Sequence, residues 1–261
     1  MKRVHLGRIA GSVAAAAVVL GLANLDAVSL MAAEATQTDM TLHEGQVQID
    51  LERIGAFAAM RVPDVRAGSR ITQLCAFDVS RGQRSCRAHS ADTRLTGTSI
   101  ALRSRDGAAQ LHFDSTTTDT VTVRNAVLNQ WADKANHQFD INLRSTLQFS
   151  GVSHASDARV LNGADTSFRT KRWGNRFATR VERTTTYSNV TIPNHAESAY
   201  PSAGVIYSSS HHTFGAIDAP RESYYSLIVY FDGTRTPLTL LDGKQFTLDL
   251  ETGIATPVKA S

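Results

Sequence analysis

Residues 226–250 constrain the fold of this chain more than any other stretch, because their pattern predicts three strands joined by two turns. Asp-Gly pairs at 232–233 and 242–243 mark the turns, since Asp and Gly tolerate the positive φ that short hairpins need. In the last strand every second residue is apolar, namely Phe246, Leu248 and Leu250. That alternation is the period of a strand with one buried face. The first strand is apolar on both faces, so we expect it inside a sheet.

Strand patterns of the same kind recur along most of the chain. Segments 98–103 and 110–114 flank another Asp-Gly pair, 138–150 has strand character, and 166–192 predicts a long hairpin. The 261 residues contain no long amphipathic helix and no repeat of fixed period. The pattern predicts an all-β protein, either an antiparallel β-sandwich or a curved open sheet built from hairpins and the C-terminal meander.

One segment leaves its secondary structure open. Residues 118–135 begin with a strand pattern, but Val123, Val127 and Trp131 also recur at the spacing of one helix face. A short helix over 124–135 is therefore an alternative to a strand.

Other stretches predict loops and bear on the number of domains. Residues 151–165 are polar and rich in turn formers, which predicts a long loop or linker, and residues 211–222 also have loop character. Residues 204–208 predict a short strand between such loops. We expect a single β-rich domain over 36–261, with any internal division near 151–165.

The N-terminal segment has the composition of a secretory signal peptide. Lysine and arginine residues near the start precede an apolar run over 9–23, which is shorter than the ~20 residues of a membrane-spanning helix. Ala-Glu-Ala at 33–35 fits a cleavage site. We therefore expect removal of residues 1–35 and a periplasmic or secreted protein without a transmembrane anchor. An uncleaved anchor is the alternative.

Two cysteines, Cys75 and Cys86, lie in a stretch that predicts a hairpin. In an exported protein an even pair most simply forms a disulfide. If Cys75 faces Cys86, the centre of the hairpin falls between Ser80 and Arg81, beside the turn former Gly82. A catalytic thiol is the alternative, but the spacing fits no CxxC or metal motif.

The most suggestive candidate for a binding site lies in the hairpin over 166–183. If residues 174 and 175 form a two-residue turn, one face carries cations and a Trp, and the other carries apolar side chains that can pack on a core. The residues of the cationic face are Arg169, Lys171, Trp173, Arg176 and Arg180. Cations contact anionic groups and an aromatic ring stacks on a sugar, so this face predicts a site for an anionic glycan or similar polymer. A solvated edge is the alternative, and a register slip of one residue would remove the pattern.

Histidines are the other candidates for chemistry. His211 and His212 are adjacent, so in a strand they point to opposite faces and do not easily share a metal. The chain has no HxH, HExxH or GxSxG motif and no nucleotide-binding glycine loop, so we expect no metal site and no cofactor. A formal net charge of +3 is too small to imply a nucleic-acid partner.

Three short C-terminal segments carry a likeness to other proteins. Residues 200–204, which begin with Tyr-Pro and end in Gly, are followed by the strand and turn segments 229–234 and 244–250. Together they resemble a C-terminal pattern in uncharacterised exported bacterial β-rich proteins. The resemblance implies export and β-structure, and it carries no catalytic residue.

The leading interpretation is an exported binding or structural protein of the cell envelope without enzymatic activity, with an anionic glycan or similar polymer as its ligand. The alternative is a secreted or periplasmic hydrolase of an envelope or extracellular polymer, which would use His211 or His212 with a nearby carboxylate. An outer-membrane or surface-assembled β-structure is less favoured, because aromatic residues form 7% of the chain, few for the aromatic girdles of a membrane barrel.

Overall fold

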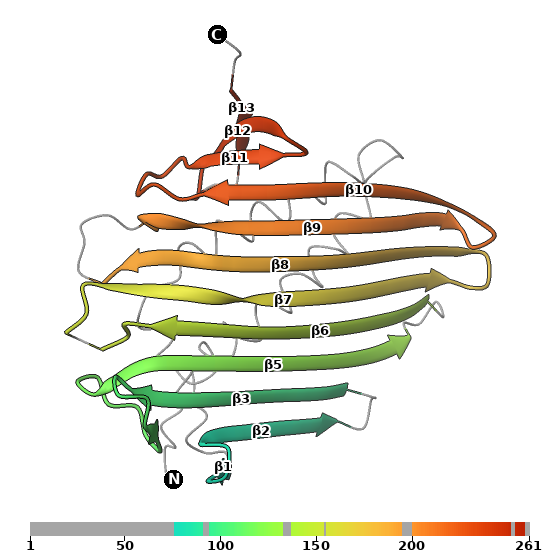
Figure 1. Ribbon diagram of the computed structural model, residues 1–261. Helices are drawn as coiled ribbons and strands as arrows, with labels where there is room; N and C mark the ends of the chain where they lie inside the picture. The colour runs from blue at the N-terminus through green and yellow to red at the C-terminus, as the bar shows by residue number, and fades with distance from the viewer. Residues whose placement is uncertain are drawn as a thin grey trace, which may run out of the picture.

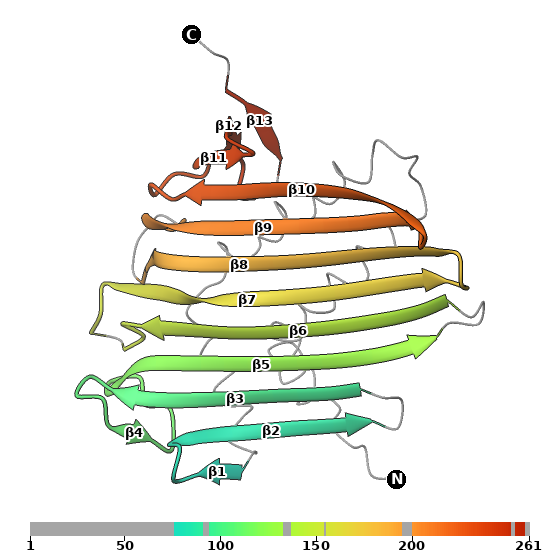
Figure 2. The ribbon, with the colours of Figure 1, turned by 45° about the vertical axis from the view of Figure 1, so that its right-hand side comes forward.

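The computed structural model describes residues 76–90, 94–132, 137–153, 155–194, 200–251 and 254–258, and these residues form one antiparallel sheet. The strands are β1 (Ala76–Asp78), β2 (Gln83–Ser90), β3 (Arg94–Ser104), β4 (Ala109–Gln110), β5 (Thr118–Ala132), β6 (His137–Ser150), β7 (Ala158–Trp173), β8 (Phe177–Pro193), β9 (Ala203–Ala216), β10 (Ala219–Tyr230), β11 (Leu238–Leu241), β12 (Lys244–Leu248) and β13 (Ala255–Pro257). They follow one another in chain order across the sheet, except that β4 pairs with β3 beside this path (Figure 1 and Figure 2). Because the described strands do not close on themselves, the all-β prediction is confirmed in the form of an open sheet.

The two faces of the sheet differ, because side chains alternate along each strand. In β8 the side chains of Val181, Arg183, Thr185 and Tyr187 are buried, and those between them are more exposed. We call the face of these four residues the buried face and the opposite one the open face. The apolar core lies on the buried face towards one end of the strands, and it includes Ile100, Leu102, Val121, Val123, Phe149, Leu161, Ile206, Leu227 and Val229. Each such side chain stabilises the fold by about 1.5–3 kcal/mol.

A band of buried polar residues continues the buried face beyond the apolar core. Its members on β7, β8 and β9 are Asp165, Ser167, Arg169, Arg183, Thr185, Ser208, Ser210 and His212. The Tyr187 hydroxyl donates a hydrogen bond of 2.7 Å to Asp165 Oδ2. Thr185 Oγ1 and Ser208 Oγ lie 3.2 Å apart. Such contacts are what burial of polar groups requires.

The C-terminal meander is confirmed in its strands and in its second turn. The apolar first strand belongs to β10, which lies inside the sheet between β9 and β11. Asp242 and Gly243 form the two-residue turn between β11 and β12, with φ of 49° and 77°, as a type I′ turn requires. Leu248 and Leu250 are buried as predicted. The first turn is longer than predicted, since β10 ends at Tyr230 and β11 begins at Leu238.

The structure decides one open alternative, and two predicted loops were wrong over much of their length. The helical alternative over 124–135 is excluded up to Ala132, because β5 runs to that residue. A spacing of four residues places side chains on one face of a strand as well as of a helix, so the pattern did not discriminate. Half of the predicted loop 151–165 is the start of β7, and 211–222 is the end of β9, a tight turn and the start of β10. Residues 211–222 carry polar side chains on both faces, and in 158–165 the apolar Val160 and Leu161 are adjacent, so neither segment shows the alternation that marks a strand.

The β1–β2 hairpin has the register expected of a hairpin in which Cys75 faces Cys86. Ala76 pairs with Ser85 and Asp78 with Gln83, so the centre falls between residues 80 and 81. Cys75 lies outside the described residues, as does the predicted signal peptide 1–35. The part of the chain that the structure describes shows no disulfide, and the disulfide stays a prediction.

Among the residues described here, none belongs to a helix long and apolar enough to cross a membrane.

Candidate functional site

The single cationic face predicted for the β7–β8 hairpin is not formed. The turn has three residues, 174–176, so Trp173 lies opposite Phe177 instead of Arg176. Gly174 has a φ of 59°, whereas Asn175 has no positive φ, and the favoured two-residue turn of type I′ needs positive φ at both positions. The extra turn residue shifts the register by one, which exchanges the faces of one strand relative to the other.

This register separates the five residues predicted to bind a ligand. Arg169 is on the buried face and is only 6% exposed. Lys171 and Trp173 share that face near the strand ends, and Lys171 Nζ lies 4.6 Å from the Trp173 ring centroid. Arg176 lies in the turn and is exposed. Arg180 lies on the open face. Of the set, Lys171 and Trp173 are therefore in contact on one face, with Arg176 in the adjoining turn, and Arg169 and Arg180 lie apart from them.

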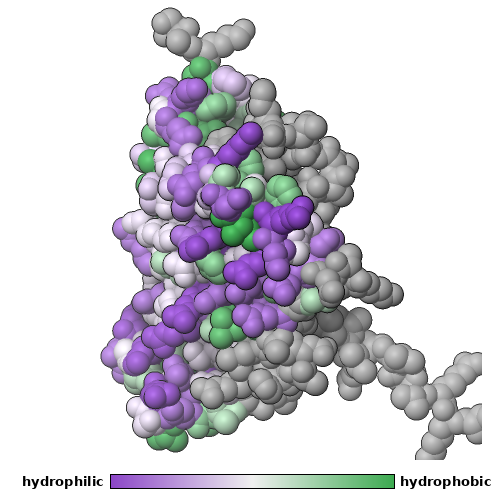
Figure 3. Space-filling model, turned by 90° about the vertical axis from the view of Figure 1, so that its right-hand side faces the viewer, coloured by the Kyte–Doolittle hydropathy of each residue, from purple (hydrophilic) through white to green (hydrophobic). Residues whose placement is uncertain are grey.

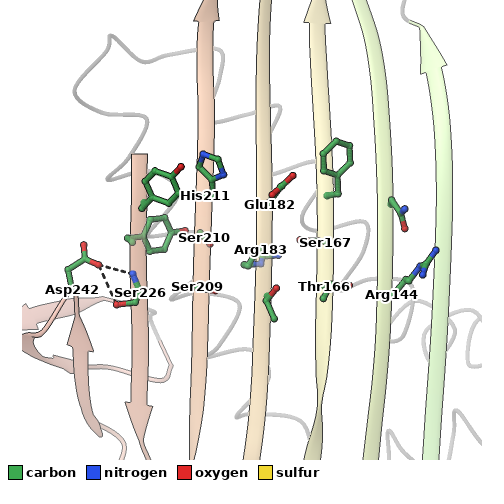
Figure 4. Close-up of a pocket in the computed structure, with 15 residues that line it drawn as sticks. Arg144, Thr166, Ser167, Glu182, Arg183, Ser209, Ser210, His211, Ser226 and Asp242 are labelled. Atoms are coloured by element: carbon green, nitrogen blue, oxygen red, sulfur yellow. Dashed lines mark hydrogen bonds between the residues drawn. The ribbon is translucent and has the colours of Figure 1, made fainter. Parts of the chain in front are cut away.

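The open face carries a shallow hollow of about 800 Å³ that crosses β6 to β10 (Figure 4). Strand register places one residue of each strand in line, so the side chains form two neighbouring rows across the strands. The first row is Asn142, Phe168, Glu182, His211 and Tyr224. The second row is Arg144, Thr166, Thr184, Ser209 and Ser226. We call these two rows, with Asp242 at their β10 end, the belt.

A second hollow of about 510 Å³ adjoins the belt on the same face. Its open-face side chains are Gln130, Gln138, Asp140, Thr170 and Arg172. On β6 it begins at Asp140, two residues from Asn142 of the belt. The two hollows together cross from β5 to β10, a distance of roughly 24 Å at ~4.8 Å between strands.

His211 and Tyr224 form an aromatic pair within the belt. Their ring centroids are 4.1 Å apart and their planes are inclined by 8°. The Tyr224 hydroxyl donates a hydrogen bond of 2.8 Å to Glu222 Oε2. This bond to a carboxylate raises the pKa of Tyr224 above its ordinary value, because the ionised phenolate would lose the bond and face a second negative charge. The stacking on His211 and the hydrogen bond to Glu222 hold the Tyr224 ring in place, and the residue is still 63% exposed.

His211 and His212 lie on opposite faces, because they belong to strand β9 and not to the predicted loop. His212 is buried and its ring centroid lies 5.5 Å from that of Tyr225. His211 Nε2 lies 3.6 Å from Glu222 Oε2 and 3.4 Å from Thr213 Oγ1. Both contacts use one nitrogen, whereas a catalytic relay joins a hydroxyl and a carboxylate through the two different ring nitrogens. The described residues contain no group of three or more His, Cys, Asp or Glu that could hold a metal ion.

Cations on the open face differ in how they are engaged. Arg180 Nε donates a hydrogen bond of 2.9 Å to Glu182 Oε1, and its guanidinium lies 4.8 Å from the Phe168 ring centroid. The side chains of Arg144 and Arg172 are exposed, and neither makes a hydrogen bond or ion pair within the described part of the chain. These two guanidinium groups therefore keep their donors available.

Sequence reasoning did not find the belt. Of its residues, only His211 was considered for chemistry, and Asp242 was predicted only as a turn former, because the others are ordinary residues of strands. The rows exist only when the registers of β6 to β10 are all known, and no local motif marks them. Thr184 and Phe168 lie in the predicted hairpin, but the assumed turn assigned Phe168 to the core-facing side.

No protein-family model, no curated protein and no solved structure matches this chain. The functional argument therefore rests on the geometry of the open face.

Proposed function

We propose that the protein is an exported cell-envelope binding protein without enzymatic activity, which holds an extended anionic glycan or similar polymer along the belt. The observation that carries the proposal is the shape and lining of the open face. A small ligand suits an enclosed pocket that buries most of its surface. The belt and its neighbouring hollow are instead shallow and cross six strands, which suits a chain that makes repeated contacts along its length.

The lining of the belt matches the chemistry of a sugar polymer. Phe168 and Tyr224 present aromatic rings that can lie against the apolar faces of sugar rings. The second row supplies hydroxyl groups, which both donate and accept hydrogen bonds as sugar hydroxyls do. Its hydroxyl-bearing residues are Thr166, Thr184, Ser209 and Ser226.

The available guanidinium groups favour an acidic polymer. Arg144 and Arg172 lie on β6 and β7, and a guanidinium binds carboxylate, sulfate or phosphate through two parallel hydrogen bonds. Arg180 is already neutralised by Glu182. At the other end of the belt, Glu222 and Asp242 would repel an acidic group, whereas over β6 and β7 the carboxylate of Asp140 is outnumbered by the two guanidinium groups. We therefore place the acidic groups of the polymer over β6 and β7.

Retention on immobilised dextran sulfate, with neutral dextran as the reference resin, tests this function. We expect the protein to bind dextran sulfate and to elute with moderate salt. The double variant Arg144→Gln/Arg172→Gln should elute at clearly lower salt and lower the slope of log affinity against log salt by roughly 1–2, since the slope counts released counterions. Neutral dextran should retain the protein weakly through the rings and hydroxyl groups alone.

A second double variant, Arg81→Gln/Arg105→Gln, is the matched control. Arg81 and Arg105 are 73% and 74% exposed and lie in turns away from the belt. The control removes the same charge, so it should elute like the unchanged protein. If both double variants elute at equally lowered salt, net charge alone causes retention and the proposed function is refuted. A protein that is retained on neither resin would also refute it.

A further inference from the structure

A cluster of three apolar side chains, two exposed and one half-buried, lies at the end of the strands that is opposite to the apolar core. It is formed by Trp173, Phe177 and Ile217, and we call it the tip. Trp173 and Phe177 pair across the β7–β8 turn. The Ile217 N–H donates a hydrogen bond of 2.9 Å to Arg176 O, which joins the β9–β10 turn to the β7–β8 turn. Phe177 is 53% exposed and Ile217 is 51% exposed.

Cationic side chains surround the tip. Lys171 lies over the Trp173 ring, Arg176 is in the turn itself, and Arg172 and Arg221 are exposed beside it. The carboxylates nearest to these cations are those of Asp218 in the β9–β10 turn, of Glu222 next to Arg221, and of Asp140, which lines a hollow with Arg172. The four cations outnumber them. Figure 3 looks onto this end of the strands and shows apolar side chains among strongly hydrophilic ones.

We propose that the tip docks the protein onto an anionic lipid bilayer. Phe177 and Ile217 would enter the boundary between headgroups and acyl chains, with Trp173 at the depth where Trp is enriched in membrane proteins. The surrounding cations would face the anionic headgroups, and each cation near the surface would strengthen binding. The proposal does not depend on polymer binding by the belt.

The form of the tip favours a bilayer over a glycan as its partner. The apolar side chains lie where strands turn, and neither of the two hollows on the open face includes them. Ile217 is aliphatic and cannot stack on a sugar ring, whereas it can be buried among acyl chains. Phe168 of the belt is five residues from Trp173 along β7, which is roughly 17 Å. A protein docked by its tip would therefore hold the belt above the membrane surface.

Co-sedimentation with lipid vesicles tests the proposal. The protein recovered after export is mixed with vesicles of phosphatidylcholine alone, or of phosphatidylcholine and phosphatidylglycerol in equal parts. We expect binding to the mixed vesicles that weakens with salt. Phe177→Ser/Ile217→Ser should lower the affinity at least roughly tenfold, because two half-exposed apolar side chains are lost. Arg176→Gln, a conservative change in an exposed turn, should lower it about fivefold.

Matched variants distinguish binding through the tip from non-specific binding through any exposed apolar side chain or any cation. Leu111→Ser/Ile254→Ser removes apolar side chains that are 45% and 57% exposed elsewhere, and Arg105→Gln removes a cation elsewhere; both should bind as the unchanged protein does. Equal binding to the two kinds of vesicle, or unchanged binding by both tip variants, would overturn the proposal. The proposal would also be overturned if the protein did not bind vesicles but formed dimers, and if Phe177→Ser/Ile217→Ser abolished these dimers. The tip would then contact a second copy of the chain.

Discussion

The rings of His211 and Tyr224 lie face to face on neighbouring strands, with centroids 4.1 Å apart and planes inclined by 8°. The register of β9 and β10 places the two residues directly opposite each other. Glu222 holds the Tyr224 hydroxyl at 2.8 Å. The Tyr224 ring is thus held in place before any ligand arrives, and binding need not pay the entropy of ordering it.

Replacing Tyr224 by Leu should weaken binding of the polymer by about 0.5–1.5 kcal/mol, or roughly twofold to tenfold in Kd, because a positioned aromatic ring is lost. Tyr224→Phe keeps the ring on His211 and should have a smaller effect. Isothermal titration with soluble dextran sulfate measures both. Tyr230→Leu is the control, since Tyr230 is 40% exposed and lies outside the belt. Similar losses for Tyr224→Leu and Tyr230→Leu would contradict a specific role of the ring.

Gly204 should not tolerate a side chain. Its φ is 102°, and a Cβ there would lie 2.3 Å from Asn189 O and 2.5 Å from Val190 Cα. We expect Gly204→Ala to lower the free energy of unfolding by more than about 2 kcal/mol in urea titrations, from backbone strain and the clash together. Gly97 lies in a strand with nothing within 4 Å of such a Cβ. Gly97→Ala should therefore change stability by less than about 1 kcal/mol; an equal loss in the two variants would argue against the close approach at Gly204.

Local chemistry was enough to predict some elements and not others. The Asp242–Gly243 turn and the alternation of β12 follow from residues within a few positions of each other, and both were predicted. The last part of β9, around His211, is polar on both faces, so nothing in the sequence distinguished it from a loop. The faces of the β7–β8 hairpin depended on whether the turn has two or three residues. The belt needed four correct registers at once, and one wrong turn is enough to hide it.

Tyr187, on the buried face, should contribute more to stability than Tyr207, which lies nearby on the open face. Its hydroxyl is buried and donates to Asp165 Oδ2. Tyr187→Phe removes a hydrogen bond to a buried carboxylate and should cost about 1–3 kcal/mol in urea unfolding. Tyr207 lies on the next strand but is 42% exposed, so Tyr207→Phe should stay within about 0.5 kcal/mol. If Tyr187→Phe also lowered the free energy of unfolding by less than about 0.5 kcal/mol, the hydrogen bond would not be important for the fold.

Turn carboxylates should make the fold sensitive to acid. Asp232 Oδ1 accepts hydrogen bonds from Thr234 Oγ1 at 2.6 Å and from Thr234 N at 3.0 Å, and these bonds lower the pKa of Asp232 below its ordinary value of 3.8. Because the unfolded chain takes up the proton first, the stabilisation is complete above that ordinary value and is lost as the pH falls through the folded pKa.

Thermal unfolding at several values from about pH 6 to about pH 3 tests this linkage. Over this range the melting temperature of Asp232→Asn should fall less than that of the unchanged protein, because the asparagine amide does not titrate. The control is Asp218→Asn, because the Asp218 carboxylate accepts no hydrogen bond within the described residues. Parallel losses in the unchanged protein and Asp232→Asn would show that other groups cause the acid sensitivity.

A disulfide between Cys75 and Cys86 should form when the protein is exported. The pairing of Ala76 with Ser85 sets a β1–β2 register whose next position outward is that of residues 75 and 86. Closing so short a loop should stabilise the fold by roughly 2–3 kcal/mol. Without reductant, neither thiol should react with iodoacetamide under denaturing conditions, as mass spectrometry would measure. Reductant should lower the urea midpoint of the unchanged protein and leave that of Cys75→Ser/Cys86→Ser where it was. Two alkylated thiols in the exported protein would contradict the pairing, and the register of the hairpin would then be maintained by its turn and backbone hydrogen bonds alone.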